Sequence, residues 1–134
     1  MTCSVNEEEF FALFPTFRRS EHSALSYLAL QSLLRMTETY TLRVDGGNFR
    51  AFKILVAAGT NGVKVDVPAF IAGVDDKSDD FKSKSPMGRV PILETSNGTL
   101  FESNAIAKFI GGLNPATNLN GSNFFEEAQV SQWL

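Results

Sequence analysis

The pattern that most restricts the fold of this chain is a helical segment placed between two strand-like segments. Residues 40–44 and residues 63–67 alternate apolar and polar side chains, as half-buried strands do. Between them, residues 45–48 (Asp-Gly-Gly-Asn) indicate a turn, and Asn48 can cap a helix. The large apolar residues at helical spacing lie on one face of that helix: Phe49, Phe52, Leu55 and Val56. Strand, helix and strand at this spacing predict a βαβ unit with parallel strands.

The second half of the pattern predicts a hairpin followed by a helix. Residues 90–94 are typical of a third strand, Asn97-Gly98 is a strong hairpin signal, and residues 99–101 are the returning strand. Ser103 can cap a helix with one apolar side, formed by Ile106, Phe109, Ile110 and Leu113. A short helix around Phe81 completes an α/β chain of order β-α-β-α-β-β-α.

The residues on either side of this pattern form separate units. Residues 1–36 contain two helix-compatible segments, 7–14 and 24–34, and we expect a weakly structured or helical extension there. Residues 37–113 form the α/β domain. Residues 114–134 comprise a linker rich in Asn, Gly, Pro and Ser, and then a helix from Phe124. Its apolar positions are Phe125, Val130, Trp133 and Leu134, and we expect it to open an all-α second domain that is truncated here.

Composition excludes several classes of function. The 134 residues carry a net charge of −3, one cysteine (Cys3) and one histidine (His22). One cysteine cannot form an internal disulfide or a thioredoxin-type redox pair, and no residues have metal-ligand spacing. The charge gives no reason to expect direct contact with nucleic acid. No apolar run reaches the length of about 18 residues that a membrane span needs.

Two local features carry candidate binding chemistry. Val90-Pro91 opens the third strand, and a cis bond there would turn the Val90 backbone toward an extended ligand; the alternative is an ordinary trans proline at a strand edge. Glu102 and Ser103 lie where the hairpin ends and the next helix begins. Free backbone N–H groups, the helix dipole and the Ser103 hydroxyl suit a carboxylate there; the alternative is simple helix capping.

In combination, these features resemble the N-terminal domain of glutathione S-transferases. The resemblance is carried by Ser-Pro-Met-Gly-Arg-Val-Pro-Ile-Leu at 85–93 and by Leu-Phe-Glu-Ser-Asn-Ala-Ile at 100–106, and it covers residues 37–134. It implies a thioredoxin-like fold with a cis proline at Pro91. By this likeness Val90 would bind the cysteinyl backbone of glutathione, while Glu102 and Ser103 would hold its γ-glutamyl end. Glutathione is then the expected ligand of such a site, and no other cofactor is required.

Within that superfamily the chain is most similar to the gamma subunit of translation elongation factor 1. The similarity is carried by residues 48–58 (Asn-Phe-Arg-Ala-Phe-Lys-Ile-Leu-Val-Ala-Ala), by residues 101–107 (Phe-Glu-Ser-Asn-Ala-Ile-Ala) and by residues 128–133 (Ala-Gln-Val-Ser-Gln-Trp). It implies a scaffold domain of protein biosynthesis in the cytoplasm. The implied partners are the nucleotide-exchange subunits of that complex, of the beta and delta type.

Thiol activation separates such a scaffold from an enzyme. A free thiol has a pKa of about 8.5, and the similar transferases use a Tyr, Ser or Cys near the first strand and helix to stabilise the thiolate. Here that position falls at about Gly46, and Gly47 and Asn48 carry no hydroxyl. Asn48 and Tyr40 remain as candidate activating positions, and no catalytic residue is assigned. We therefore expect a non-catalytic scaffold.

Two other functions stay open at this point. One is a glutathione S-transferase that conjugates glutathione to small electrophiles. The other is a transferase-like interaction domain of a different assembly, such as an aminoacyl-tRNA synthetase complex.

The apolar helix positions also lead to an expectation about association. Not all of them can lie under the sheet: Phe49, Phe52, Phe109, Ile110 and Leu113. Those left exposed would form an apolar patch and promote self-association. Residues 25–34 could fold back over that patch, so removing residues 1–35 is expected to strengthen association.

Overall fold

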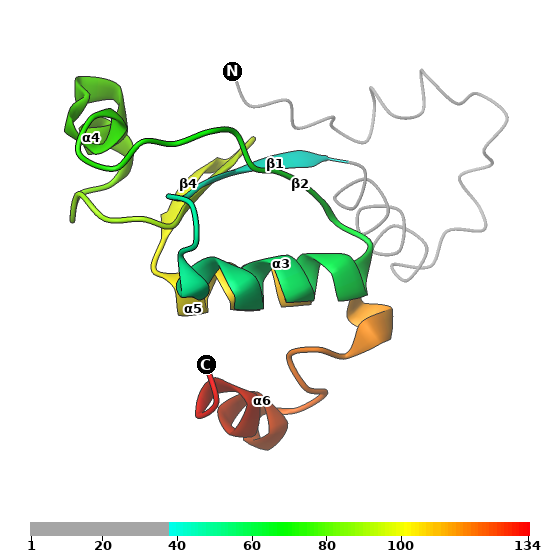
Figure 1. Ribbon diagram of the computed structural model, residues 1–134. Coiled ribbons are helices and arrows are strands. Elements are labelled where there is room, and N and C mark those ends of the chain that lie inside the picture. Colours follow the sequence, from blue (N-terminus) through cyan, green and yellow to red (C-terminus); the bar gives the residue numbers. More distant parts are fainter. Residues whose placement is uncertain (1–37) are drawn as a thin grey trace, which may run out of the picture.

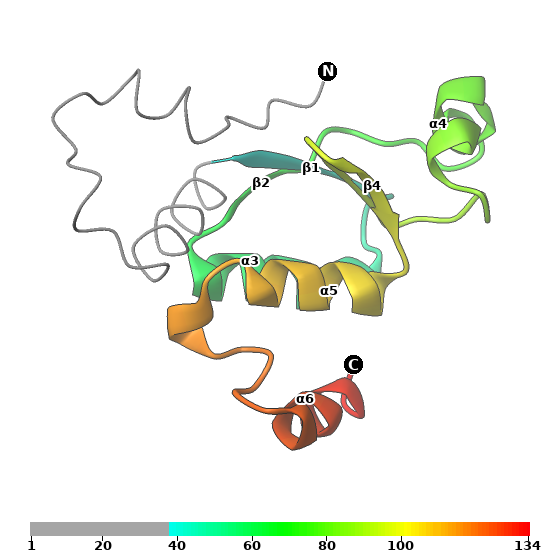
Figure 2. The ribbon, with the colours of Figure 1, turned by 180° about the vertical axis from the view of Figure 1, so that it is seen from behind.

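The computed structural model describes residues 38–134, so the two helical segments expected within residues 1–36 lie outside the described residues. A four-stranded sheet forms one layer, and helices α3 (Phe49–Asn61) and α5 (Ser103–Gly112) lie side by side against one of its faces (Figure 1, and from behind in Figure 2). Helix α6 (Phe124–Ser131) lies on the side of these two helices that faces away from the sheet (Figure 1). The predicted α/β fold class is confirmed.

The predicted βαβ unit forms the first half of the domain. Strand β1 (Thr39–Arg43) pairs in parallel with β2 (Lys64–Asp66), and α3 connects them. Asn48 caps α3 as expected, because its side-chain oxygen accepts a hydrogen bond from the Arg50 N–H. Gly62 ends the helix with φ 68°, a left-handed conformation that suits glycine.

The predicted hairpin forms the second half of the sheet. Strand β3 (Ile92–Thr95) runs antiparallel to β1 and to β4 (Gly98–Phe101), giving the strand order β2-β1-β3-β4. The third strand was expected to begin at Val90 and begins two residues later, at Ile92. Pro91 has no N–H to contribute to a strand ladder, which accounts for the later start.

The apolar face expected on helix α3 is not the face that packs on the sheet. Its four large residues point outward: Phe49 is 68% exposed, Phe52 60%, Leu55 37% and Val56 68%. The buried residues on this helix are mostly small: Ala51, Ile54, Ala58 and Asn61. Two stripes with helical spacing therefore exist on α3, and the alanine-containing stripe lets the helix approach both the sheet and α5 closely.

The core lies between the sheet and the helix pair. Tyr40 and Leu42 of β1 meet Ile106 and Ile110 of α5 there, and Leu113 closes one end. The apolar side predicted for α5 is thus confirmed at Ile106, Ile110 and Leu113, whereas Phe109 is only half-buried. The Phe109 ring meets the Tyr40 ring edge to face at a centroid distance of 5.8 Å.

The connection from β2 to β3 carries the short helix expected around Phe81. A 3₁₀ turn, η1 (Asp75–Lys77), leads into helix α4 (Asp79–Lys84), which Ser78 caps by accepting a hydrogen bond from the Phe81 N–H. Phe81 is buried and packs against Phe70 with ring centroids 5.3 Å apart. Helix α4 is thereby anchored beside the end of the sheet, away from α3 and α5 (Figure 1).

Helix α6, which follows α5, packs only weakly on the rest of the domain. A 3₁₀ turn, η2 (Pro115–Thr117), precedes it, and α6 itself buries no residue. Of its expected apolar positions, Leu134 packs against the core, while Phe125 and Trp133 are exposed. No helix among residues 38–134 has the length and apolar character that crossing a membrane requires.

Candidate functional site

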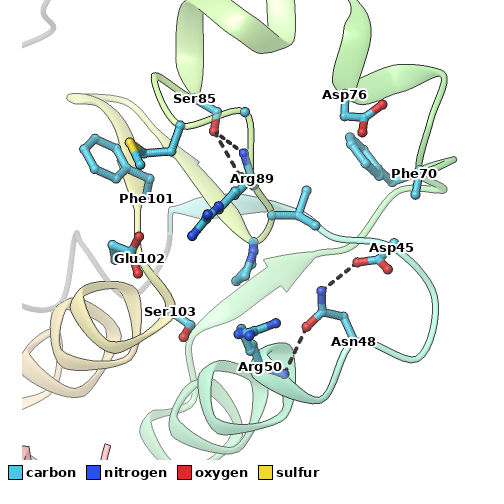
Figure 3. A pocket seen from close by; sticks show the side chains of 15 residues that line it. Asp45, Asn48, Arg50, Phe70, Asp76, Ser85, Arg89, Phe101, Glu102 and Ser103 are labelled. Carbon is cyan, nitrogen blue, oxygen red and sulfur yellow. Dashed lines mark hydrogen bonds between the residues drawn. The ribbon is translucent and has the colours of Figure 1, made fainter.

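A cavity of about 620 Å³ lies where the start of α3, the β2–α4 connection, the segment before β3 and the β4–α5 junction meet (Figure 3). Five residues singled out from the sequence line it: Asn48, Val90, Pro91, Glu102 and Ser103. Residues that are far apart in sequence thus come together as the resemblance implied. The Val90–Pro91 peptide bond is cis, as predicted.

Tyr40, the other candidate activating residue, does not line this cavity. Its side chain lies in the core, with 1% of its surface exposed, in contact with Phe109. The alternation of β1 could not tell which face Tyr40 takes. The packing of β1 over α5 directs this side chain into the core.

The β4–α5 junction differs in one respect from the expectation that Ser103 caps the helix. Glu102 occupies the cap position with φ 69° and ψ 115°, and its side chain makes no capping hydrogen bond. Its carbonyl accepts the first helical bond, from the Ile106 N–H at 3.0 Å. Ser103 is the first helical residue, so the prediction that it caps α5 is wrong.

This geometry leaves donors available at the cavity. The first N–H groups of a helix have no partner within it and carry the positive end of the helix dipole. Ser103 contributes both a backbone N–H and a hydroxyl there, and Glu102 places a carboxylate beside them (Figure 3). A carboxylate and an amine on one ligand could both find complementary groups at this end of the cavity.

The segment before the cis proline is held by a serine that the sequence reasoning overlooked. Ser85 is buried, and its hydroxyl both donates to the Arg89 carbonyl and accepts from the Arg89 N–H, each at 3.0 Å. The Gly88 N–H donates to the Ser85 carbonyl at 2.9 Å, and Gly88 has φ 60°. This turn fixes the backbone from which the Arg89 side chain reaches into the cavity (Figure 3). The Ser-Pro-Met-Gly turn signal was the available clue.

Both polar atoms of the Asn48 side chain form hydrogen bonds within its own loop. Its side-chain oxygen accepts from Arg50 N–H at 3.1 Å, and its Nδ2 donates to Asp45 Oδ1 at 2.7 Å (Figure 3). The amide is therefore committed to shaping the start of α3.

Apart from Glu102, the charged residues of the cavity were not predicted from the sequence. Two cations, Arg50 and Arg89, and three acids, Asp45, Asp76 and Glu102, line it. The ion pairs among residues 38–134 all lie elsewhere in the fold, so neither arginine pairs with a cavity acid. In Figure 3 the arginines enter between Glu102 on one side and the two aspartates on the other. No spacing in the sequence signalled this arrangement, because the five residues come from four separate segments.

The sheet order, the cis proline and the β4–α5 junction together define the transferase-type domain of the thioredoxin-like fold. Residues 40–112 match the family described as glutathione S-transferase, N-terminal domain, and the chain belongs to that family.

Two relatives show which proteins with this domain the chain resembles. The chain is 48% identical over 89 residues to probable elongation factor 1-gamma 1 of Arabidopsis thaliana, an alignment that covers 66% of this chain and 22% of that protein. It is 41% identical over 101 residues to the glutathione S-transferase-like protein FUS3 of Gibberella moniliformis, covering 74% of this chain and 46% of that one. The resemblance to elongation factor 1-gamma drawn from the sequence is confirmed. The chain spans about a fifth of the length of these elongation-factor relatives.

Among solved structures, glutathione S-transferase-I bound with lactoylglutathione is similar to this chain. The TM-score is 0.62 and the identity 26%, and the alignment covers 70% of this chain and 46% of that one.

Proposed function

We propose that this domain is a scaffold of the translation elongation factor 1-gamma type, which holds nucleotide-exchange subunits of the beta and delta type in the cytoplasm. The observation that carries the proposal is the 48% identity with probable elongation factor 1-gamma 1, over two thirds of this chain. In this proposal residues 37–113 form the transferase-like unit, and residues 114–134 form a linker and the first helix of an all-α unit.

The chemistry of the cavity supports a non-catalytic role. A thiol with a pKa of about 8.5 is only slightly ionised at neutral pH and needs a donor to become a thiolate. Gly46, Gly47 and Asn48 supply no hydroxyl, and Asn48 is committed to Asp45 and Arg50. The side-chain hydroxyls that line the cavity belong to Ser85, which is engaged with the Arg89 backbone, and to Ser103.

Capture of exchange subunits tests the scaffold proposal. The full chain, carrying an affinity tag, would be mixed with purified beta-type and delta-type exchange subunits and analysed by size-exclusion chromatography. We expect a co-eluting complex of fixed stoichiometry. An unrelated protein that carries the same tag is the control that should not co-elute. Failure of both exchange subunits to co-elute with this chain would contradict the scaffold role.

The cavity also supports binding of a glutathione-like peptide. We place the cysteinyl backbone at Val90, next to Pro91, and the γ-glutamyl end at Glu102 and Ser103, where a carboxylate and free helix N–H groups lie together. The similar structure that holds lactoylglutathione supports this choice of ligand. Such binding requires no thiolate, so it is compatible with a scaffold.

A glutathione S-transferase is the second candidate function, favoured by the same cavity. The test is conjugation of glutathione to an aromatic electrophile by the full chain, beside the variants Asn48→Ala and Tyr40→Phe. We expect negligible turnover in all three proteins, because no free hydroxyl lies where activation is needed. Robust turnover by the full chain would overturn this view, and its loss in Asn48→Ala or in Tyr40→Phe would show which of the two residues it requires.

A further inference from the structure

The dipeptide Asn-Gly occurs three times in this chain, at residues 61–62, 97–98 and 120–121. In such a pair the backbone nitrogen of the glycine can attack Cγ of the asparagine, because glycine has no Cβ to hinder the approach. A succinimide ring forms and ammonia leaves, so the asparagine loses its side-chain amide. The three pairs share this chemistry, and the fold therefore decides which of them can react.

Burial and hydrogen bonds protect the first pair. Asn61 is 1% exposed, and its Nδ2 donates to the carbonyls of Ile110 at 2.7 Å and Gly111 at 3.1 Å. The Gly62 N–H, whose nitrogen would have to attack, donates to the Ala58 and Gly59 carbonyls at the end of α3. The reaction would require α3 and α5 to separate at this end, which opens the core.

Contacts with α5 also protect the third pair. Asn120 is half-buried, and its Nδ2 donates to the Lys108 carbonyl at 2.7 Å. Its side chain packs so closely on α5 that a Cβ at Gly111 would lie 2.6 Å from Asn120 Oδ1. The Gly121 N–H donates to the Asn118 carbonyl at 3.1 Å. Both reacting groups of this pair are therefore engaged.

The second pair lies at the tip of the β3–β4 hairpin, where Asn97 and Gly98 are both exposed. Among residues 38–134 the Asn97 side chain has no hydrogen-bond partner, and the turn is held through its backbone. The Asn97 N–H donates to Thr95 Oγ1 at 3.1 Å, and the Thr95 hydroxyl donates to the Gly98 carbonyl at 2.8 Å. Thr95 and Gly98 form the last pair of the ladder, so fraying of that pair alone frees the turn.

We propose that Asn97 is a site of spontaneous deamidation, and that the fold protects the other two Asn-Gly pairs. The Gly98 nitrogen loses its proton and bonds to Asn97 Cγ, while the bond from Cγ to Nδ2 breaks and releases ammonia. Water then adds to a carbonyl of the ring and opens it to aspartate or isoaspartate. Either product carries a carboxylate at neutral pH, which adds a negative charge at the hairpin tip. Isoaspartate also lengthens the main chain within the turn by a methylene group.

Peptide mapping of the full chain by mass spectrometry tests the proposal. The protein would be kept folded in mildly alkaline buffer, which favours loss of the glycine N–H proton, and sampled over time. We expect Asn97 to lose its amide at least about tenfold faster than Asn61 and Asn120, because those two react only from locally opened states. The matched control is the same chain unfolded in urea, in which the three pairs should react at similar rates.

The variant Asn97→Ser removes the reactive amide and keeps a small polar residue in the turn. We expect the more acidic species that accumulates in the parent chain on ion-exchange chromatography to be absent from this variant. Deamidation of the folded chain at Asn61 or Asn120 as fast as at Asn97 would overturn the inference. So would an Asn97 that stays intact in the folded chain, or a preference for Asn97 of the same size in urea, which would assign it to local sequence.

Discussion

Asn61 is the buried polar residue that holds the two helices of the domain together at one end. Its Nδ2 donates to the carbonyls of Ile110 at 2.7 Å and Gly111 at 3.1 Å, near the end of α5. Its side-chain oxygen accepts a hydrogen bond from the Thr117 hydroxyl in η2. One side chain therefore links the end of α5 to η2 and supplies a donor to the carbonyl of the buried Gly111.

Replacing this side chain should be costly. Asn61→Leu keeps a similar volume but removes the hydrogen bonds that Asn61 forms with Ile110, Gly111 and Thr117, so we expect a loss of about 1–3 kcal/mol in the free energy of unfolding. Urea denaturation measures it. The control is Thr60→Ala, at the neighbouring exposed position, which should change stability by less than about 0.5 kcal/mol. An Asn61→Leu midpoint equal to that of the parent chain would show that water satisfies these groups equally well.

Ser103 should matter for binding and little for stability. Its hydroxyl does not cap α5, because Glu102 holds the cap position. We therefore expect Ser103→Ala to change the free energy of unfolding by less than about 0.5 kcal/mol. If the γ-glutamyl carboxylate binds here, glutathione affinity should fall about tenfold, the value of one hydrogen bond to a charged group. Glutathione titration of both proteins measures this, and equal affinities would place the carboxylate elsewhere.

At the scale of elements, Glu94 connects strands β1 and β3 with helix α4. Its Oε1 accepts from Arg43 Nε on β1 at 2.8 Å, and its Oε2 lies 3.3 Å from Lys84 Nζ at the end of α4. Lys84 also pairs with Asp80 within α4, at 2.9 Å. Partial burial raises the pKa of Glu94, but the hydrogen bonds from Arg43 and Lys84 outweigh this and hold the pKa below its ordinary value.

The contribution of Glu94 to the free energy of unfolding therefore depends on pH. The lowered pKa of Glu94 contributes stability that is present above the ordinary value of 4.5 and is lost as the pH falls through the lower pKa of the folded protein. We expect Glu94→Gln to reduce stability by about 1 kcal/mol at neutral pH, and this difference to shrink below pH 4.5. Denaturation at several pH values measures it, with Asp66→Asn on exposed β2 as the charge control. A difference that stayed constant with pH would mean that Glu94 acts by packing.

At the scale of the whole molecule, α3 and α6 carry most of the exposed phenylalanines of the part of the chain that the structure describes. Phe49, Phe52 and Val56 are exposed on α3, as are Phe124 and Phe125 on α6. The expectation that some of the helix residues would be exposed therefore applies to α3. Ile110 and Leu113 are the members of that set that lie buried in the core.

Self-association should depend on that α3 surface. We predict that the 134-residue chain associates at high concentration, that removing residues 1–35 strengthens the association, and that Phe52→Ser weakens it, because exposed apolar patches favour contact. Sedimentation velocity over a concentration series measures the extent of association. Lys64→Ser, an exposed change on β2, is the control. A monodisperse monomer of the shortened chain would show that the α3 surface does not drive association and that residues 1–35 do not shield it.

The features that could be predicted from the sequence are those that neighbouring residues decide. The βαβ order, the Asn48 cap and the hairpin at Asn97-Gly98 could be predicted, because turn chemistry and side-chain alternation act over a few residues. The cis bond before Pro91 was predicted from the resemblance to glutathione S-transferases. The resemblance placed Glu102 and Ser103 at the junction that lines the cavity, although it could not tell which of the two holds the cap position.

Only the tertiary structure decided which of two equally periodic faces of α3 is buried. Small Ala51 and Ala58 allow close packing on α5 and the sheet, and this outweighs the larger apolar area of Phe49 and Phe52. The tertiary structure also sent Tyr40 into the core and gathered Arg50, Arg89, Asp45 and Asp76 around one cavity. Such arrangements depend on contacts between segments far apart in the chain, and periodicity within one segment holds no information about them.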